Sequence, residues 1–484
     1  MATPIPSNQA SFTLSELAAA CGGQLQLGAE TLRVTGVTSD SRRVQAGELY
    51  VALRGEHHDG HAFLSAAQRA GAAAALVSDT SQLPAGLPAV LVADTRRALG
   101  DLARAHRRRW GKPVVAITGS AGKTTTKELT AAALGGTGRR VLKTFGNLNN
   151  DVGLPMTLFG LSDAHDVAVV EIGTSGPGEI ERLREICEPN VGVVTTVALA
   201  HVEKLASLDA VADEKCALLR GLPADGTAIY GHESAELEAR RATFAGARVM
   251  SFGEGEGASV RLVARTARED MTSHCAVVFQ QPALRIEFEL KLFGAAPAQD
   301  AAAALAVIAA LGDPAALQPA AAALGSVEPL PGRLRPCKGR AGSLIIDDSY
   351  NANPASMLSS LAAVREIAAL RKGRAIAALG DMAELGEHAQ AEHERLGRAL
   401  VQAGLADVFL CGPLMADAAR AAKGEVKRLR AKGPHVVHCS DPTASVPELM
   451  RLLSQRDAVL IKGSRSMAME RVVEALCLDK GERA

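Results

Sequence analysis

The stretch Val114–Lys127, VVAITGSAGKTTTK, has residue types and spacing that could bind a polyphosphate. An apolar, β-branched run precedes a turn of small residues, and a segment compatible with a helix follows. Gly119 and Gly122 let the backbone approach a phosphate closely, and the N-terminus of the following helix adds partial positive charge. The sequence therefore predicts a phosphate-binding loop between a strand and a helix.

Three side chains after the second glycine have the chemistry that such a loop needs. Lys123 would reach the terminal phosphates, Thr124 would place its hydroxyl on a magnesium ion that bridges them, and Thr125 could help or substitute. Ile117 stands where the longer loop pattern has a glycine, so this is the shorter G-x-x-G-K-T type. A simple turn before a lysine-capped helix is the structural alternative, but the preceding strand and the three consecutive threonines favour nucleotide binding. The predicted loop residues are Gly119, Ser120, Ala121, Gly122, Lys123, Thr124 and Thr125.

Polar residues at the ends of later strands could complete this site. Residues 166–173, DVAVVEIG, are predicted to form a buried parallel strand that ends in Glu171, our candidate magnesium ligand. Glu171 could instead only cap the next turn. His201 follows a second predicted strand, and Lys215 lies on a helical pattern after it. A lone histidine or lysine is usually structural, so from the residues alone both roles stay open.

Two loop-rich stretches are candidates for binding the rest of a substrate. The turn GNLNNDVGLP (residues 146–155) is rich in asparagine, which suits hydrogen bonding better than a core. In the first hundred residues, polar and cationic side chains beside glycines suit a sugar or phosphate ligand, although ordinary solvated loops explain them as well. The candidate substrate-binding residues are Ser39, Asp40, Ser41, Arg42, Arg54, Asp59, His61, Asn149 and Asn150.

The elements that must position these residues form three predicted units. A basic cluster with glycine and proline, residues 104–113, marks a linker, and its charge run is expected to be a solvated helix end. PGRL (residues 331–334) marks a second boundary, after which strands and helices alternate as in an open parallel sheet. We therefore predict an α/β fold with domains at residues 1–112, 113–331 and 332–484, the last of them Rossmann-like.

Composition and charge limit the class of protein. The chain has 484 residues, more than one hydrophobic core normally serves. Lysine plus arginine equals aspartate plus glutamate, 53 against 53, which gives no electrostatic case for a nucleic-acid or membrane-surface partner, so small substrates are expected. The eight cysteines are scattered without zinc-type spacing and are interpreted as reduced thiols.

The N-terminal stretch MATPIPSNQA has neither a basic nor an apolar signal region, so we expect no secretory signal and a cytoplasmic protein. The longest alanine-leucine run, Ala301–Leu311, is too short to span a bilayer and is interpreted as a buried helix. No membrane span is predicted, and we expect a monomer.

Taken together, these strings resemble the Mur ligases, ATP-dependent amide-forming enzymes of peptidoglycan precursor synthesis. The shared marks are TGSAGKTTTK, the strand-end Glu171, AHVE, Lys215, PGRL and DDSYNANPAS. Four further strings are similar to the branch of the family that joins D-alanyl-D-alanine to UDP-N-acetylmuramoyl-tripeptide. They are LGDMAELGE, VLIKGSRSMAMERVV, GNLNNDVGLP and the N-terminal TSDSRRVQAGELYVALRGEHHDGHAF. The resemblance covers nearly the whole chain.

The resemblance implies an N-terminal domain for the UDP end of the substrate, a central P-loop ATPase domain and a C-terminal domain that closes over the site. It implies ATP and Mg²⁺ as cofactors and an acyl-phosphate mechanism. Lys123, Glu171, His201 and Lys215 would be catalytic, with Thr124, Glu171, His201 and Lys215 around the metal. Lys215 matches a lysine that is carboxylated in the family. Arg333 and Asp348 would contact the nucleotide, and Asn351 would lie beside it.

The chain departs from the family pattern in two places. Ala296 and Pro297 stand where a His-Asn pair usually contacts adenine, so the base must be held by other residues. Ser175 and Gly176 replace a common Asn-His, and Thr196 replaces a frequent asparagine. Alternatives are the ligase that adds the third amino acid, a folylpolyglutamate-type ligase, and a catalytically silent nucleotide-binding homologue. The LGDMAELGE string argues against the first two.

Overall fold

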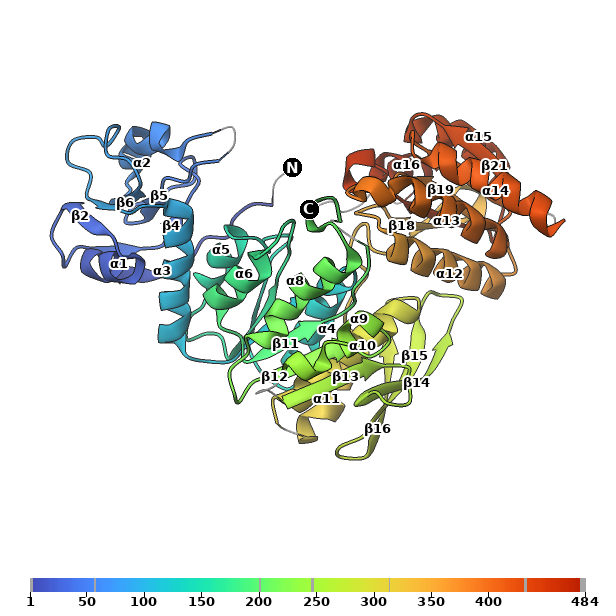
Figure 1. Ribbon diagram of the computed structural model, residues 1–484, viewed down its shortest axis with the longest axis horizontal. Helices are drawn as coiled ribbons and strands as arrows, with labels where there is room; N and C mark the ends of the chain where they lie inside the picture. The colour runs from blue at the N-terminus through green and yellow to red at the C-terminus, as the bar shows by residue number, and fades with distance from the viewer. Residues whose placement is uncertain are drawn as a thin grey trace.

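The computed structural model describes residues 3–55, 58–199, 202–244, 248–312, 314–430 and 433–478. Three α/β bodies follow one another along the chain, in blue, green to yellow, and orange to red (Figure 1). This confirms the predicted α/β fold with three domains. Within the described residues, no helix is long and apolar enough to cross a membrane.

The N-terminal body is a small sheet in the order β2-β7-β6-β5-β4, in which only the β2–β7 pairing is antiparallel, with a separate antiparallel pair, β1–β3. Its strands and helices are β1 (Ser11–Thr13), α1 (Leu14–Cys21), β2 (Gln24–Leu27), β3 (Arg33–Thr35), β4 (Val37–Thr38), β5 (Leu49–Val51), α2 (Leu64–Ala70), β6 (Ala74–Val77), β7 (Ala89–Leu91) and α3 (Thr95–Trp110). Short strands and alanine-rich segments therefore make up this body.

The central body is a mixed sheet in the order β16-β15-β14-β13-β12-β11-β8-β10-β9. Only β14–β15 and β15–β16 pair antiparallel, so this side of the sheet is an antiparallel edge. Its elements are β8 (Val114–Thr118), α4 (Lys123–Gly136), β9 (Val141–Lys143), α5 (Gly153–Leu158), β10 (Val167–Glu171), α6 (Glu179–Cys187), β11 (Val191–Val194), α7 (Val202–Leu205), α8 (Leu208–Arg220), β12 (Thr227–Gly231), α9 (Ala235–Glu238), β13 (Arg248–Gly253), β14 (Val260–Ala267), β15 (Ser273–Phe279), β16 (Leu284–Leu290), α10 (Ala295–Ala310) and α11 (Leu317–Leu324). Because β8 lies between β10 and β11, the loops after these three strands meet at one edge.

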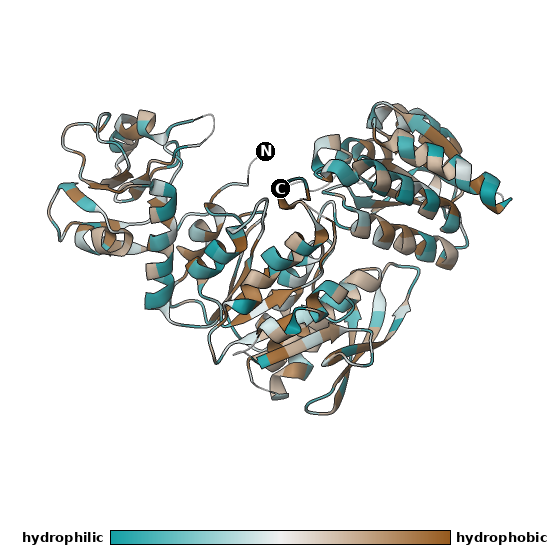
Figure 2. Cartoon of the chain, viewed as in Figure 1, coloured by the Kyte–Doolittle hydropathy of each residue, from teal (hydrophilic) through white to brown (hydrophobic). Residues whose placement is uncertain are grey.

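The C-terminal body is the predicted Rossmann-like sheet, in the order β17-β18-β22-β19-β20-β21, with β17 antiparallel at its edge. Its elements are β17 (Arg335–Lys338), β18 (Leu344–Asp348), α12 (Pro354–Leu370), β19 (Ala375–Gly380), α13 (Ala389–Gln402), β20 (Asp407–Cys411), α14 (Met415–Leu429), β21 (His435–Cys439), α15 (Val446–Leu452), β22 (Ala458–Lys462) and α16 (Glu470–Leu476). Hydrophobic residues concentrate on the buried strands, and the outer faces of the helices are largely hydrophilic (Figure 2).

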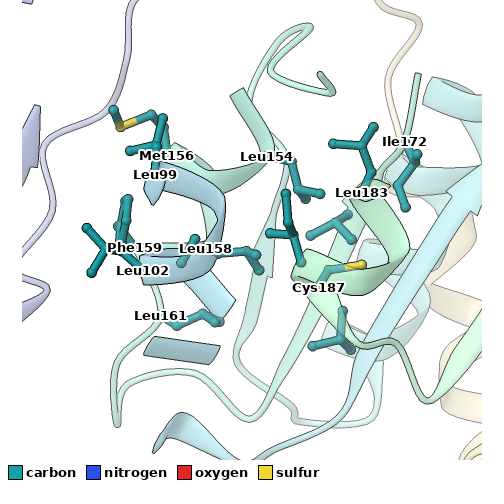
Figure 3. Close-up of a cluster of buried hydrophobic side chains, with 14 of the residues drawn as sticks. Leu99, Leu102, Leu154, Met156, Leu158, Phe159, Leu161, Ile172, Leu183 and Cys187 are labelled. Atoms are coloured by element: carbon teal, nitrogen blue, oxygen red, sulfur yellow. The ribbon is translucent and has the colours of Figure 1, made fainter. Parts of the chain in front are cut away.

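Helix α3 joins the first two bodies. Its leucines Leu99 and Leu102 lie beside Leu158 and Phe159 in one buried cluster (Figure 3). The basic run at its end is only partly solvated, because buried Arg107 donates hydrogen bonds to the carbonyls of residues 187 and 188, at the end of α6. The expectation of a solvated helix end is therefore wrong for this arginine, since those carbonyls lack partners within their own helix.

Candidate active site

The loop between β8 and α4 has the backbone that a phosphate loop needs. Gly119 and Gly122 both have positive φ, +151° and +82°. A Cβ added to Gly119 would lie 1.9 Å from the Thr195 hydroxyl, and one added to Gly122 would lie 2.6 Å from Oδ1 of Asp300. Both positions therefore require glycine, for conformation and for space.

The segment after β11 braces this loop from one side. The amide of Ser120 donates to the carbonyl of Thr196 over 2.8 Å, and the Thr195 hydroxyl donates to the carbonyl of Ala121. The amide of Ala198 donates to the Ser120 hydroxyl over 3.0 Å. The sequence predicts a strand over residues 191–198, but β11 ends at Val194: the amide of Thr195 still donates to the carbonyl of Thr118 in β8, whereas the carbonyl of Thr196 accepts from the loop.

Lys123 begins α4 and folds back over the loop, where its Nζ donates to the carbonyl of Gly119 over 2.7 Å. Burial lowers the pKa of this ammonium, the charge of Glu171 raises it, and the charge of Arg333 lowers it further. Lys123 and Arg333 thus line one cavity and lie within electrostatic reach of each other. Such a pair suits a ligand that carries several negative charges.

Glu171 ends β10 and is buried, with 3% of its surface exposed. The Thr124 hydroxyl donates to its Oε2 over 2.8 Å, and the Asn149 amide donates to its Oε1 over 2.8 Å. Its backbone amide donates to the hydroxyl of Thr144 over 2.9 Å. A hydroxyl and a carboxylate fixed beside a phosphate loop are oxygen donors of the kind that Mg²⁺ prefers.

The other two predicted catalytic residues are Lys215 and His201. Lys215 on α8 is buried, with 2% exposure, and burial and the charge of Lys123 lower its pKa to about 7. It lies outside the residues that line the cavity. His201 lies outside the described residues. Among the described residues, no group of three or more His, Cys, Asp or Glu side chains could hold a metal ion.

The loop opens into a cavity of about 650 Å³ whose opposite wall is the C-terminal body. Arg333, Asp348 and Asn351 line this wall. The guanidinium of Arg333 lies over the ring of Tyr350, 4.4 Å from its centroid. The two bodies also touch directly, because the Asn353 amide donates to the carbonyl of Ser120 over 3.2 Å. Predicted nucleotide-binding residues from two bodies therefore share one cavity.

The predicted substrate-binding residues divide into two groups. Asn149 and Asn150 line the cavity, although Oδ1 of Asn150 already accepts the amide of Gly153 over 2.8 Å. The other predicted substrate residues do not line it. These are Ser39, Asp40, Ser41, Arg42, Arg54, Asp59 and His61, all in the N-terminal body.

Three of these residues, Arg54, Asp59 and His61, form what we call the N-terminal cluster. Arg54 donates to Asp59 over 3.1 Å and to Asp79 over 3.3 Å. The buried ring of His61 contacts Oδ1 of Asp59 at 2.6 Å and accepts the amide of Ser78 over 3.0 Å. Asp40 and Arg42 form a separate exposed pair with two contacts of 2.8 Å. The structure thus brings the N-terminal cluster together without opening it into the cavity.

Sequence reasoning missed the role of two residues on the cavity wall. Asp300 is the only charged residue of the alanine-rich α10; Thr126 donates to it over 3.0 Å, and burial raises its pKa to about 7. An isolated acid in an apolar helix was the available signal. Asn353 lies inside the DDSYNANPAS string, but no spacing rule indicates its contact with the loop.

Ala296 and Pro297 also line the cavity. Their side chains cannot hydrogen-bond, so these two positions offer a ligand only apolar contact.

A P-loop cavity closed by a second α/β body is the architecture of a nucleotide-dependent ligase. Three family descriptions match the chain: "Mur ligase family, catalytic domain" over residues 33–107, "Mur ligase middle domain" over residues 117–308, and "Mur ligase, glutamate ligase domain" over residues 332–465. The chain belongs to the Mur ligase family, whose members are ATP-dependent, ADP-forming ligases. The resemblance predicted from the motifs is confirmed.

Relatives of the whole chain narrow this class. The UDP-N-acetylmuramoyl-tripeptide--D-alanyl-D-alanine ligase of Escherichia coli K12 is 37% identical, over 96% of this chain and 98% of that protein. The Bacillus subtilis ligase of the same name is 32% identical, over 92% and 93%. A crystal structure of MurF from Acinetobacter baumannii superposes with a TM-score of 0.85 at 29% identity, over 98% and 99%. MurF from Thermotoga maritima in complex with ADP gives a TM-score of 0.78 at 27% identity, over 91% and 96%.

Proposed function

We propose that this protein joins D-alanyl-D-alanine to UDP-N-acetylmuramoyl-tripeptide with hydrolysis of ATP to ADP and phosphate, the last cytoplasmic step in assembling the peptidoglycan precursor peptide. The observation that carries the proposal is the single cavity shared by the phosphate loop, the buried Glu171 and the C-terminal Arg333. Relatives that carry this name match almost the full length of the chain.

The chemistry follows from the energetics of amide formation. A carboxylate and an ammonium do not condense in water, so the tripeptide carboxylate attacks the γ-phosphorus of ATP and ADP leaves. The amine of D-alanyl-D-alanine then attacks the acyl-phosphate carbonyl, and the tetrahedral adduct expels phosphate as the amide forms. The acyl phosphate must be shielded from water, and the C-terminal wall of the cavity supplies that shield.

Charge assigns the roles of the residues around the phosphates. In this proposal the amides of the loop and Lys123 hold the β- and γ-phosphates, while Arg333 approaches them from the opposite wall. Asp348 and Asn351 lie beside the nucleotide. These groups need only position charge, because phosphoryl transfer requires little covalent help from the protein.

Thr124 and Glu171 would hold a Mg²⁺ ion, and His201 would contribute to a second. The oxygen donors of the first two residues fit this ion, since Mg²⁺ keeps a few protein oxygens and takes the rest from phosphate and water. Bound there, the ion would neutralise charge on the transferring phosphoryl group. Asn149 supports this site by fixing the second oxygen of Glu171.

We also propose that Lys215 is carboxylated. With a pKa of about 7, the lysine is a free amine part of the time at neutral pH. Its nitrogen can then attack the carbon of CO₂ and lose a proton, which gives a carbamate. This replaces a buried cation near Lys123 with an anion that could serve as a metal ligand.

In this proposal the UDP end of the substrate binds to the N-terminal domain, residues 1–112, and the residues in question are Ser39, Asp40, Ser41, Arg42, Arg54, Asp59 and His61. The central domain, residues 113–331, binds ATP, and the C-terminal domain, residues 332–484, completes the cavity. One chain carries the whole cavity, which supports a monomeric enzyme.

The decisive experiment measures phosphate release with ATP, Mg²⁺, UDP-N-acetylmuramoyl-tripeptide and D-alanyl-D-alanine, with each component omitted in turn. We expect release only when all four are present, together with the pentapeptide product by mass spectrometry. Both the diaminopimelate and the lysine forms of the tripeptide should be supplied. ADP binding without phosphate release from either form would instead favour a silent nucleotide-binding homologue, the alternative suggested by Ala296 and Pro297.

A further inference from the structure

The wall of the cavity opposite the phosphate loop contains a buried ion pair between two strands. Nζ of Lys462, at the end of β22, lies 2.7 Å from Oδ2 of Asp348, at the end of β18. The side chains are 4% and 11% exposed. Lys462 also donates to the carbonyl of Asn351 over 3.0 Å. The lysine therefore fixes both the aspartate and the loop that follows it.

Most of the hydrogen-bonding capacity of Asp348 is used inside the protein. The Ser360 hydroxyl donates to its Oδ2 over 2.6 Å, and the amide of Leu334 donates to its Oδ1 over 3.2 Å. Together with Lys462, these partners take about three of the four acceptor positions of a carboxylate. Asp348 is consequently an anchor for neighbouring backbone more than an open ligand for a nucleotide.

The backbone that Asp348 anchors is the segment that carries Arg333. Leu334 follows it directly, and on the other side the amide of Gly332 donates to Oδ2 of Asp347 over 3.0 Å. Tyr350 lies in the loop that Lys462 holds, and its ring stacks under the guanidinium of Arg333, 4.4 Å from ring centroid to Cζ. Its backbone amide donates to the carbonyl of Gly332 over 3.2 Å. The charge of Arg333 lowers the pKa of Lys123, which places the guanidinium within electrostatic reach of the phosphate loop.

We propose that Lys462 is a positioning residue that acts through Asp348 to hold Arg333 against the phosphates of the bound nucleotide. The inference rests on the nucleotide site of the proposed function and adds Lys462 as the residue that positions Arg333, the second cation of that site. A buried pair of this kind adds little net stability, but removing one partner leaves the other charge unpaired. Without Lys462, Asp348 would lose its charge partner, and the loop under Arg333 would lose its tie to β22.

The test is a double-mutant cycle on ADP affinity, measured by calorimetry with Mg²⁺ on the full chain. We expect Lys462→Met and Arg333→Ala each to weaken ADP binding roughly tenfold or more, as loss of a hydrogen bond to a charged group does. The double variant should bind no more weakly than Arg333→Ala alone, because both changes remove the same contact. Effects that multiply would overturn the proposal.

A matched control separates positioning from stability. Arg374 and Asp457 form another ion pair at 2.7 Å in the same body, in which the aspartate is buried and the arginine is exposed, and neither residue lines the cavity. Arg374→Met should lower the melting temperature yet leave ADP affinity within about twofold, whereas Lys462→Met should lower both. Equal loss of ADP affinity in the two variants would show a general effect of stability and would refute the proposal.

Two further variants keep the test informative. If Lys462→Met does not fold, Ser360→Ala removes a single hydrogen bond to Asp348 and should weaken ADP binding about threefold, again only while Arg333 is present. Lys462→Arg keeps the charge and should recover part of the affinity. Because ADP binding needs no turnover, an inactive protein that still shows this coupling would refute only the ligase function. An active ligase without the coupling would refute only the role of Lys462.

Discussion

In the P-loop cavity, Lys123 and Arg333 line the same space and lie within electrostatic reach of each other, whereas the N-terminal cluster neutralises its own charges. Arg54 already bonds to Asp59 and Asp79, and both ring nitrogens of His61 have partners. Both regions are rich in charge. They differ in whether that charge is left available to a ligand.

This difference has an energetic consequence. A ligand at the cavity gains two cations that are held in place before it arrives, so little reorganisation opposes binding. A ligand at the N-terminal cluster must compete with existing ion pairs for Arg54. These pairs are half exposed, and water screens such ion pairs, so the competition is weak. The cavity should therefore control the rate, and the cluster should control only affinity for one part of the substrate.

The largest expected effect comes from the cavity. Lys123→Ala removes a cation that faces the transferring phosphoryl group, and we expect phosphate release to fall by about 10²–10³-fold. The exposed Lys143→Ala is a matched control, because its ammonium bonds only to Glu128 among the described residues. The two variants are compared by steady-state phosphate release, with circular dichroism to verify folding. Normal activity in Lys123→Ala would contradict the P-loop assignment.

A smaller effect is expected when the charge of Glu171 is removed and its shape is kept. Glu171→Gln retains an oxygen for Thr124 but is a much weaker magnesium ligand. We expect the rate at ordinary Mg²⁺ to fall about 10²-fold and to recover partly as Mg²⁺ is raised. A magnesium titration of the rate measures this. If the variant loses activity with no change in its Mg²⁺ dependence, Glu171 supports the loop structurally instead of binding the ion.

The two regions also show what the sequence could predict. Strand, loop and helix around Lys123 follow from local rules, because glycines, β-branched runs and a helix N-terminus impose their own geometry. The strand-end Glu171 followed from sheet topology, since parallel strands present their ends at one edge. Local rules could not predict that Arg54 forms an ion pair with Asp79, which lies twenty-five positions further along the chain.

Contacts between the bodies could not be predicted from the sequence either. The hydrogen bond from Asn353 to the carbonyl of Ser120 joins residues 233 positions apart, and no periodicity encodes it. Asp300 faces the loop only because α10 packs across α4. The burial of Arg107 likewise depends on the carbonyls at the end of α6, a partner that the basic run itself does not indicate.

The N-terminal cluster yields the next prediction. Arg54→Ala should raise the KM for UDP-N-acetylmuramoyl-tripeptide about tenfold, as loss of a cation that can bind a phosphate would, and leave kcat and the KM for ATP within about twofold. Arg42→Ala, which breaks only the exposed pair with Asp40, tests whether that second cation contributes as well. Initial rates with varied tripeptide measure both. A fall in kcat in Arg54→Ala would show that the two regions are coupled and would break the comparison drawn above.

The smallest effect concerns two buried titratable groups, Lys215 and His61. His61 has a hydrogen-bond partner at each ring nitrogen, whereas Lys215 has no hydrogen bond of its ammonium among the described residues and a pKa lowered to about 7. Carboxylation requires the neutral amine, whose fraction is small at pH 6 and large at pH 8. We therefore expect the rate in CO₂-depleted buffer to fall severalfold at pH 6.5, to fall less at pH 8, and to be restored by bicarbonate. Phosphate release in degassed buffer, with bicarbonate added back, measures this. A rate that does not respond to bicarbonate at either pH would mean that Lys215 acts as a plain amine, and the cavity would then hold its metal without a carbamate.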